Sequence, residues 1–313
     1  MPSLSINRFG VFGVAVVVAA LLKPQAVLPR DVLFQAHQAA AIVAAKAYDQ
    51  QTVLTVHNAY EQPMGLLEQL TRTGLRSLEV DIQPDKRGRP ALRDDWYVYH
   101  RDLPLFDDSR CTRLSECLER IADFHAGEPQ HEPVTLFVDL KEPFGGTQSP
   151  EALDGLLAEH LGRNTLYTPA DLVARCEGAR SPAEAVRKCG WPTVQELRGR
   201  FLVALTGGGS CEPDLPLAGY AKDASTALSR LAFLAPSIEG SCTRAEYEAH
   251  QPQVVFFNLD WAQRDEVAKL RPSRFVSRLY QGGIYGGLDD ERLVAALKAE
   301  RPTFLATDRL DWP

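Results

Sequence analysis

The residues of this sequence that could do chemistry concentrate between positions 53 and 100, where short apolar runs end in polar side chains. The runs are Val-His-Asn at 56–58, Leu-Glu-Val-Asp-Ile at 78–82 and Tyr-Val-Tyr-His at 97–100. Each run has the pattern of a β-strand, so the polar groups at its end would gather at one rim of a sheet. The sequence therefore predicts a site that contains His57, Asn58, Glu79, Asp81 and His100.

Glu79 and Asp81 lie two positions apart in their strand, so they share one face while Leu78, Val80 and Ile82 take the other. Two neighbouring carboxylates repel each other, and one of them binds a proton unless a cation lies between them. Taken alone, such a pair is most often a solvated strand face, because charged residues stay exposed unless they are paired. Two histidines at the ends of neighbouring runs favour a metal site instead.

A later strand adds two more charged groups, Asp139 and Lys141, which lie two positions apart on one face. Together with the first segments it offers four oxygen ligands, namely Asn58, Glu79, Asp81 and Asp139. Oxygen ligands suit a hard cation, Ca²⁺ or Mg²⁺, better than zinc. The two histidines then remain for proton transfer, and a lysine beside the metal suits a phosphorylated substrate. A plain salt bridge from Lys141 to Asp139 or Glu142 is an equally good interpretation.

The elements that must position these groups alternate between strands and helices. A strand at 52–56, a helix at 63–73 and a strand at 76–82 form a βαβ unit, which implies a parallel sheet. Further strands are expected at 96–100, 134–140, 201–205, 231–234, 254–257, 275–279 and 303–306, and further helices at 114–124, 150–161, 265–270 and 289–300. We predict an α/β TIM barrel, (β/α)8, in which active groups lie at the carboxyl ends of the strands.

These strands number nine where a (β/α)8 barrel needs eight. We expect the surplus one to be 231–234 or 254–257. The length of 313 residues fits a single barrel domain at 51–313, because such barrels commonly run to roughly 250 residues. The formal net charge of −7 argues against nucleic-acid binding, which usually needs a basic face.

The amino terminus has the composition of an export signal. Asn7-Arg8 precedes an apolar run at 9–22 that ends at Lys23-Pro24, which is typical of a secretory signal and short for a membrane span of about 20 residues. We expect a signal peptide or anchor at 1–28 and a helical lead-in at 29–50, and a secreted or periplasmic protein that stays membrane-anchored if the leader is uncleaved.

Six cysteines agree with export, because none forms a C-x-x-C pair and their number is even. Sequential pairing is one of about 15 arrangements. It would join Cys111 to Cys117, Cys176 to Cys189, and Cys211 to Cys242.

The order of these motifs resembles the calcium-dependent phosphoinositide-specific phospholipases C, in the compact bacterial form of the phospholipase C-like phosphodiesterase superfamily. The matching segments, in order, are His-Asn-x-Tyr at 57–60, Leu-Glu-Val-Asp at 78–81, Val-Tyr-His at 98–100, the strand at 133–139, the segment 196–203 and Ser-Arg-Leu-Tyr at 277–280. Each motif is short, but together they span most of residues 52–306.

The resemblance implies that Asn58, Glu79, Asp81 and Asp139 hold one calcium ion against a phosphodiester. Glu79 or another nearby carboxylate would then take the proton of the inositol 2-hydroxyl. His57 would stabilise charge on phosphorus, and His100 would protonate the departing diacylglycerol oxygen. Lys141, Arg278 and Tyr280 would contact the substrate. The products would be diacylglycerol and a cyclic inositol phosphate.

The sequence also departs from the animal enzymes of this family. Their two lysines that grip ring phosphates are replaced by Ala204 and Thr206, and Asp139 stands where they typically have Glu. The resemblance therefore implies plain phosphatidylinositol at a membrane surface as the substrate. We expect a monomer with no obligate protein partner.

Two other functions remain open. A glycerophosphodiester phosphodiesterase or a phospholipase D-like hydrolase would use the same barrel, although the usual His-Arg-Gly opening of the former is missing here. A barrel that binds a lipid head group in the presence of calcium without cleaving it belongs to a different class.

Overall fold

The computed structural model describes residues 43–101, 109–212, 215–281 and 287–308. The compact unit that contains them runs from Val43 to Pro313. The expected leader at 1–28, and the part of the helical lead-in before residue 43, lie outside the described residues.

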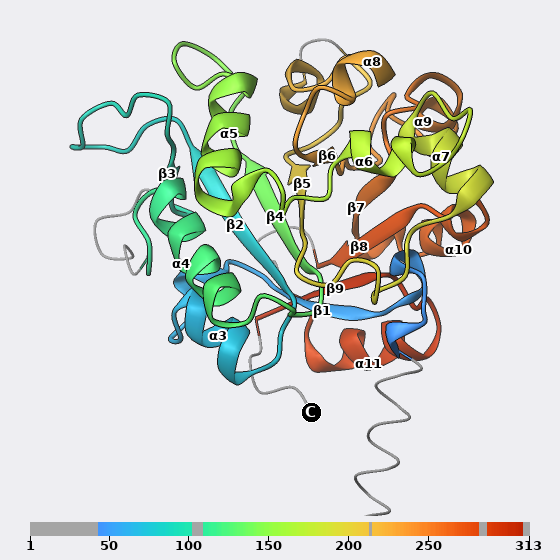
Figure 1. The fold of residues 1–313 in the computed structure, drawn as a ribbon, viewed down its shortest axis with the longest axis horizontal. Coiled ribbons are helices and arrows are strands. Elements are labelled where there is room, and N and C mark those ends of the chain that lie inside the picture. Colours follow the sequence, from blue (N-terminus) through green and yellow to red (C-terminus); the bar gives the residue numbers. More distant parts are fainter. Residues whose placement is uncertain (1–42, 102–108, 213–214, 282–286, 309–313) are drawn as a thin grey trace, which may run out of the picture. The chain divides into compact units, whose positions relative to one another are not determined.

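Eight parallel strands form a nearly closed barrel, in the order β6-β5-β4-β2-β1-β9-β8-β7 (Figure 1). Their bounds are β1 Val53–Val56, β2 Ser77–Gln83, β4 Val134–Leu140, β5 Phe201–Thr206, β6 Phe233–Leu234, β7 Phe256–Asp260, β8 Val276–Tyr280 and β9 Phe304–Thr307. Strands β6 and β7 are the two ends of this strand order. Pro236, which has no N–H to donate to a ladder, follows β6, and its carbonyl accepts from the backbone N–H of Asn258 in β7 at 3.0 Å. The predicted barrel is confirmed.

The surplus strand is β3, Tyr97–Val98, and both strands that we expected to be surplus belong to the barrel. β3 pairs antiparallel with β2, with Ile82 opposite Val98 and Gln83 opposite Tyr97. A two-residue strand cannot be told from a short barrel strand by its pattern, because both are apolar and buried. The sequence suggested that His100 ends a barrel strand, and this prediction is wrong. His100 follows a short return strand that runs back along β2.

The helices lie outside the strands (Figure 1). Their bounds are α3 Leu66–Arg72, α4 Leu114–Gly127, α5 Pro150–Leu157, α6 Pro169–Ala174, α7 Pro182–Cys189, α8 Ala224–Ala227, α9 Arg244–His250, α10 Glu266–Leu270 and α11 Asp290–Lys298. Five of them were expected from the sequence, and four short ones, α6 to α9, were not. Three of those four begin at a Ser, Thr or Asp N-cap with Pro or an acidic residue in the first turn, which are recognised start signals.

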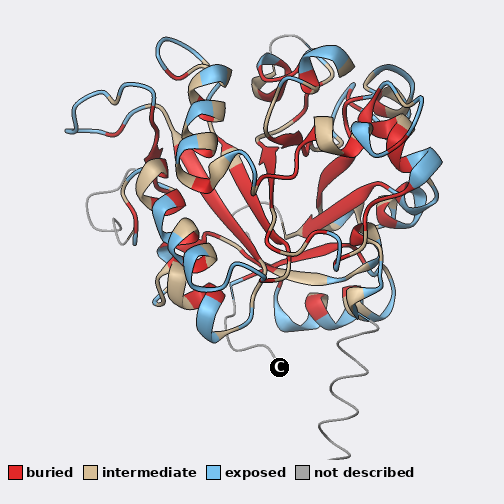
Figure 2. Cartoon of the chain, in the orientation of Figure 1, coloured by how far each residue is buried: buried red, intermediate tan, exposed pale blue. Residues whose placement is uncertain are grey.

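The barrel strands are buried along most of their length (Figure 2). Every residue of β5 is buried, and in β2 only the last residue, Gln83, is partly exposed. One face of each strand packs against helices and the other fills the barrel. Because Glu79 and Asp81 belong to β2, they are buried too, at 4% and 1% exposure. The solvated strand face that a carboxylate pair usually forms is thereby excluded.

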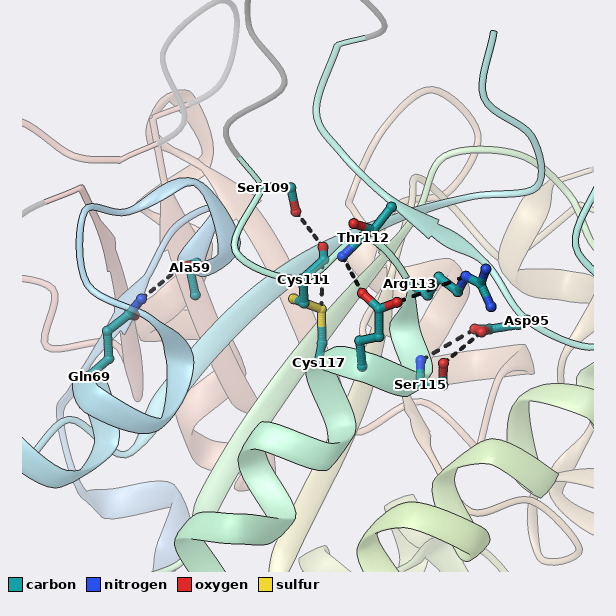
Figure 3. The surroundings of a disulfide bond; sticks show 10 residues. Ala59, Gln69, Asp95, Ser109, Cys111, Thr112, Arg113, Ser115 and Cys117 are labelled. Carbon is teal, nitrogen blue, oxygen red and sulfur yellow. Dashed lines mark hydrogen bonds and ion pairs between the residues drawn. A yellow bond between two sulfur atoms is a disulfide. The ribbon is translucent and has the colours of Figure 1, made fainter. Parts of the chain in front are cut away.

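All three expected disulfides are present, Cys111–Cys117, Cys176–Cys189 and Cys211–Cys242. The first of them fixes the start of α4 (Figure 3). Beside it, Asp95 accepts hydrogen bonds from the Ser115 hydroxyl at 2.7 Å and from its own neighbour, the Trp96 N–H, at 2.8 Å. These contacts hold the segment that leads into β3, and with it the position of His100.

No helix among the described residues is long and apolar enough to cross a membrane.

Candidate metal centre and active site

Three carboxylates converge inside the barrel because of strand register. Asp81 of β2 is the direct partner of Asp139 in β4, and Glu79 lies two residues earlier on the same face as Asp81. Ligand atoms of these three residues all lie within 4.8 Å of one another. We call Glu79, Asp81 and Asp139 the acidic triad.

Thr206 extends this row onto the next strand. It is the register partner of Asp139 in β5, and its hydroxyl donates a hydrogen bond to Asp139 Oδ1 at 2.9 Å. Thr206 therefore orients a carboxylate of the triad.

Two cations of the protein contact different members of the triad. The Lys141 ammonium lies 3.0 Å from Asp81 Oδ2 and also bonds Asp139. The Arg278 guanidinium lies 2.7 Å from Glu79 Oε2 through Nη2. The salt bridge from Lys141 to Asp139 that the sequence left open is thus present, and it includes Asp81.

Arg278 is held in place by its neighbours. Its Nη1 donates to Asn258 Oδ1 at 2.8 Å, and Asn258 is its register partner in β7. The guanidinium carbon also lies 5.1 Å from the ring centre of Phe137 and 5.7 Å from that of Tyr280. With 1% exposure, Arg278 is among the largest fully buried side chains of the described residues. The expected contact of Arg278 and Tyr280 with a head group stays a prediction.

His57 is oriented by an acidic residue from the far end of the chain. Val56 and Thr307 are register partners in β1 and β9, so the next residues, His57 and Asp308, emerge side by side. His57 Nδ1 lies 2.8 Å from Asp308 Oδ1, and His57 Nε2 lies 3.9 Å from Glu79 Oε2. One ring nitrogen therefore faces the orienting carboxylate, and the other faces the triad.

His100 reaches the triad from the other side. Continuing the antiparallel register of β3 brings residues 99 and 100 back along β2 to the level of Asp81. His100 Nδ1 lies 3.4 Å from Asp81 Oδ2 and 2.9 Å from Asn58 Nδ2. The ring centres of His57 and His100 are 6.4 Å apart. An imidazole thus lies beside each carboxylate of β2, His57 beside Glu79 and His100 beside Asp81.

Asn58 occupies a left-handed backbone conformation, with φ 46° and ψ 52°. Asn tolerates this region better than most residues. Its side-chain amide donates to Glu61 Oε2 at 3.1 Å and lies against His100. The structure therefore links Asn58 to the triad through His100.

The charged groups of the site shift one another's pKa values. Burial lowers the pKa of His57, but the negative charges of Glu79 and Asp308 outweigh it and raise that pKa overall. Burial, and then the positive charges of Lys141 and His57, lower the pKa of His100. The pKa values of the two imidazoles thus shift in opposite directions. This arrangement is common where one imidazole acts as a cation and the other as a proton carrier.

The carboxylates of the triad are close enough to shift one another's pKa values. Burial and the neighbouring Asp139 raise the pKa of Asp81. Burial would raise the pKa of Asp139 as well, but Lys141 and Thr206 outweigh it and lower that pKa. Glu79 Oε2 and Asp81 Oδ2 are buried without a hydrogen-bond donor of normal geometry. A hard divalent cation fits this set of carboxylate oxygens, since it would relieve the repulsion between them.

Comparison with known proteins agrees with this geometry. The family model described as "Phosphoinositide phospholipase C, Ca2+-dependent" matches residues 102–254, a range that contains Asp139 and Lys141. Over this range the chain is similar to the calcium-dependent phosphoinositide phospholipases C. No curated protein matches the sequence.

Solved structures of bacterial enzymes share the fold. A calcium-dependent phosphoinositol-specific phospholipase C from Pseudomonas sp. is 20% identical, with a TM-score of 0.72 over 86% of this chain and 93% of that one. A Ca²⁺-dependent phosphatidylinositol-specific phospholipase C from Streptomyces antibioticus is 24% identical, with a TM-score of 0.65 over 85% of this chain and 96% of that one. The family is calcium-dependent by its description, and the acidic triad offers the oxygen ligands that calcium prefers.

Sequence reasoning missed two residues of this candidate site. Asp308 carried a usable signal, because it follows the last strand directly and so lies at the same rim as His57. Asn258 carried none, because a single amide inside an apolar run looks like an interruption of the strand. The structure brings together all three carboxylates of the expected metal site, both histidines and Lys141.

Proposed function

We propose that this protein is a calcium-dependent phosphodiesterase that cleaves phosphatidylinositol-type phospholipid to diacylglycerol and a cyclic inositol phosphate. The observation that supports it most is the placement of two imidazoles beside an acidic triad in which Glu79 and Asp81 are buried and Asp139 is partly buried. A solvated or structural carboxylate cluster has no need of a histidine on each flank, whereas phosphodiester cleavage needs a charge-stabilising group and a proton donor.

Glu79, Asp81 and Asp139, with Asn58, would hold the calcium ion, which when bound neutralises charge on the phosphodiester. Around it, the protein's own residues would move the protons. Glu79 or another nearby carboxylate accepts the proton of the inositol 2-hydroxyl. The protonated form of His100, which is a stronger acid because its pKa is lowered, donates a proton to the departing diacylglycerol oxygen.

His57 would act as the cation of the site. Its raised pKa keeps it protonated over a wider pH range than a free imidazole. The Asp308 carboxylate fixes Nδ1 and so aims Nε2 towards the reacting centre. This places a positive charge where negative charge develops on phosphorus, which is the usual way in which such sites stabilise a transition state.

The residues of β5 favour plain phosphatidylinositol over polyphosphorylated inositides as the substrate. Ala204 and Thr206 offer no positive charge for ring phosphates, and Thr206 is already bonded to Asp139. Lys141 and Tyr280 are the residues that we assign to the substrate's phosphate and ring, with Arg278 behind them. The enzyme would act as a monomer at a membrane surface.

The three disulfides are typical of proteins from an oxidising compartment. We propose that the protein is secreted or periplasmic and that residues 1–28 direct its export or anchor it.

Product analysis tests the proposed reaction. Purified protein would be incubated with phosphatidylinositol vesicles and Ca²⁺, and separately with glycerophosphoinositol. Release of diacylglycerol and cyclic inositol phosphate from the lipid alone supports the phospholipase C. Preference for glycerophosphoinositol would identify a glycerophosphodiester phosphodiesterase, and phosphatidic acid a phospholipase D. Calcium-dependent vesicle binding without any product would identify a binding module.

A chelator supplies the matching control. Excess chelator should abolish turnover, and added Ca²⁺ should restore it. Full activity in the chelator would mean that the acidic triad serves something other than a metal.

A further inference from the structure

The two cations that contact the acidic triad differ in how freely they can leave it. Arg278 is buried to 1% exposure and bonds both Glu79 and Asn258. The Lys141 side chain is 29% exposed, although its ammonium contacts Asp81 and Asp139. Removing Arg278 from its place would require repacking between Phe137 and Tyr280. Moving Lys141 requires only rotations of a flexible chain that already reaches solvent.

The two cations also leave the triad unbalanced. His57 pairs with Asp308 at 2.8 Å, so the charges of these two residues compensate each other. The three carboxylates of the triad then face two positive side chains, and one negative charge is uncompensated when all five are ionised. Replacing the single charge of lysine by the double charge of calcium, with Arg278 kept in place, balances the three carboxylates. A buried group of charges is most stable when it is compensated.

The contacts of Lys141 are those that a divalent cation would need. Its ammonium lies between Asp81 and Asp139, which are register partners and the closest pair of the triad by strand position. Lysine and ion cannot both contact Asp81 Oδ2 without strong repulsion between like charges. Among the ion pairs of the described residues, Arg278 contacts Glu79 and neither aspartate of the triad.

From these contacts we propose that Lys141 is a tethered counter-ion that takes the place of calcium in the ion-free protein, and that calcium displaces its ammonium towards the substrate's phosphate. The proposal deepens the proposed function and rests on it. Lys141 then has two positions. In the ion-free protein it holds Asp81 and Asp139 together, and in the calcium-loaded protein its charge becomes available to an anion. Calcium binding and phosphate binding are thereby coupled through one side chain.

The first test is calcium binding to the protein without lipid. Isothermal titration with CaCl₂ compares the wild type with Lys141→Met, which removes the competing charge at similar volume. We expect Lys141→Met to bind calcium at least about tenfold more tightly, because no ammonium has to be displaced. Lys269→Met is the matched control, since Lys269 pairs with Glu266 on the surface of α10 and its loss changes net charge equally. Equal affinity in wild type and Lys141→Met would overturn the proposal.

The second test uses a soluble anion, myo-inositol 1-phosphate. In calcium, we expect Lys141→Met to bind it at least about fivefold more weakly than the wild type. In chelator, where the wild-type lysine is occupied by Asp81 and Asp139, the two proteins should bind it equally weakly. The same loss in both conditions would mean that Lys141 is available to phosphate at all times, which contradicts the proposed exchange.

The third test is thermal stability, which needs neither lipid nor inositol phosphate. Without its counter-ion, Lys141→Met should melt at a lower temperature than the wild type in chelator and gain more from calcium. If that variant folds only with calcium, its calcium-dependent folding supports the proposal, and Lys141→Gln serves for the titrations. An equal calcium-induced increase in Tm in wild type and variant would contradict it.

The outcomes also separate this proposal from the proposed function. If neither the wild type nor the variants bind calcium, the calcium-dependent function itself fails. If the wild type binds calcium and turns over the lipid while Lys141→Met binds no more tightly, only the counter-ion role fails.

Discussion

His57 Nδ1 and Asp308 Oδ1 lie 2.8 Å apart although 251 positions separate the two residues in the sequence. The contact follows from the pairing of the first and last strands, β1 and β9, whose register partners Val56 and Thr307 immediately precede them. The closure of the barrel is therefore also what orients the imidazole. Asp308 also packs closely against Gly287. A side chain at position 287 would not fit, since a Cβ there would lie 2.5 Å from the Asp308 backbone nitrogen.

Asp308→Asn should lower both the rate and the pKa of His57. Burial lowers that pKa, and Glu79 and Asp308 raise it, so removing the Asp308 charge shifts it downward. His57 then loses its proton at a lower pH, and the alkaline limb of the profile of kcat/KM against pH should move to lower pH. We expect kcat to fall on the order of 10². Asp265→Asn, at the start of α10, is the control. An unmoved alkaline limb would show that Asp308 does not act through the charge of His57.

His100→Ala should abolish phosphodiester cleavage while calcium binding survives. His100 contacts Asn58 and Asp81 but adds no oxygen ligand, so its loss removes the proton donor and leaves the acidic triad in place. We expect a fall in kcat of about 10²–10⁴, with calcium affinity within a few-fold of the wild type by titration. His160→Ala, whose partner is Glu119 on α4, is the control. Retained turnover in His100→Ala would remove this residue from the mechanism.

Asp139→Asn should remove calcium binding. The substitution keeps the shape of the side chain but takes away one of the three negative charges, and calcium affinity depends strongly on the charge count of its ligands. We expect the affinity to fall by about 10² or more, measured by titration without lipid. Glu142→Gln changes net charge equally three residues away, at an exposed position, and should bind like the wild type. Calcium affinity that is the same in both variants would place the ion elsewhere.

The sequence predicted the barrel and most of the site because both depend on local patterns. Apolar runs of strand length alternate with helical spacing, and the side-chain parity of β2 alone places Glu79 and Asp81 on one face. The rule that active groups follow barrel strands then predicted His57, Asp139 and Lys141 without any knowledge of the register.

What the sequence did not reveal depends on pairing between distant strands. β3 was taken for a barrel strand because two buried residues carry no sign of strand direction. The Asn258–Arg278 bond and the Thr206–Asp139 bond exist because these residues are register partners, and register is a property of the folded sheet. The burial of Arg278 was hidden for the same reason, since an arginine in a strand pattern is usually assigned to solvent.

Loss of the Cys176–Cys189 disulfide should destabilise the protein without changing the site. The bond joins Cys176, just after α6, to Cys189, the last residue of α7, and so closes a loop with a sequence separation of 13. For a loop of this length, chain entropy gives about 3 kcal/mol in the free energy of unfolding. We expect Cys176→Ser/Cys189→Ser to melt several degrees below the wild type, measured in calcium and in chelator. Its calcium affinity should be unchanged. A variant that melts like the wild type would show that this loop is already ordered by α6 and α7.

A buried histidine outside the site should make the protein sensitive to acid. His131 is fully buried between Phe124 and Phe201, and it contacts His125 at 3.0 Å and the Glu132 carbonyl at 2.6 Å. Burial is the main cause that lowers its pKa. The unfolded chain, with an imidazole pKa of about 6.5, then binds protons more readily than the folded one. The contribution of the neutral His131 to the free energy of unfolding is therefore fully present above about pH 6.5. It is lost as pH falls through the pKa of His131 in the folded protein.

His131→Phe should reduce this acid sensitivity, because an aromatic ring without a titratable group fits between the same two phenylalanines. The measurement is the free energy of unfolding at pH 7.5 and pH 5, in chelator so that calcium binding does not contribute. We expect a lower value than the wild type at pH 7.5, where two hydrogen bonds are lost, and a smaller decrease between the two pH values. His250→Gln, at the exposed end of α9, is the control and should follow the wild type. If the wild type and His131→Phe lose the same free energy on acidification, the acid response comes from the carboxylates and the other histidines.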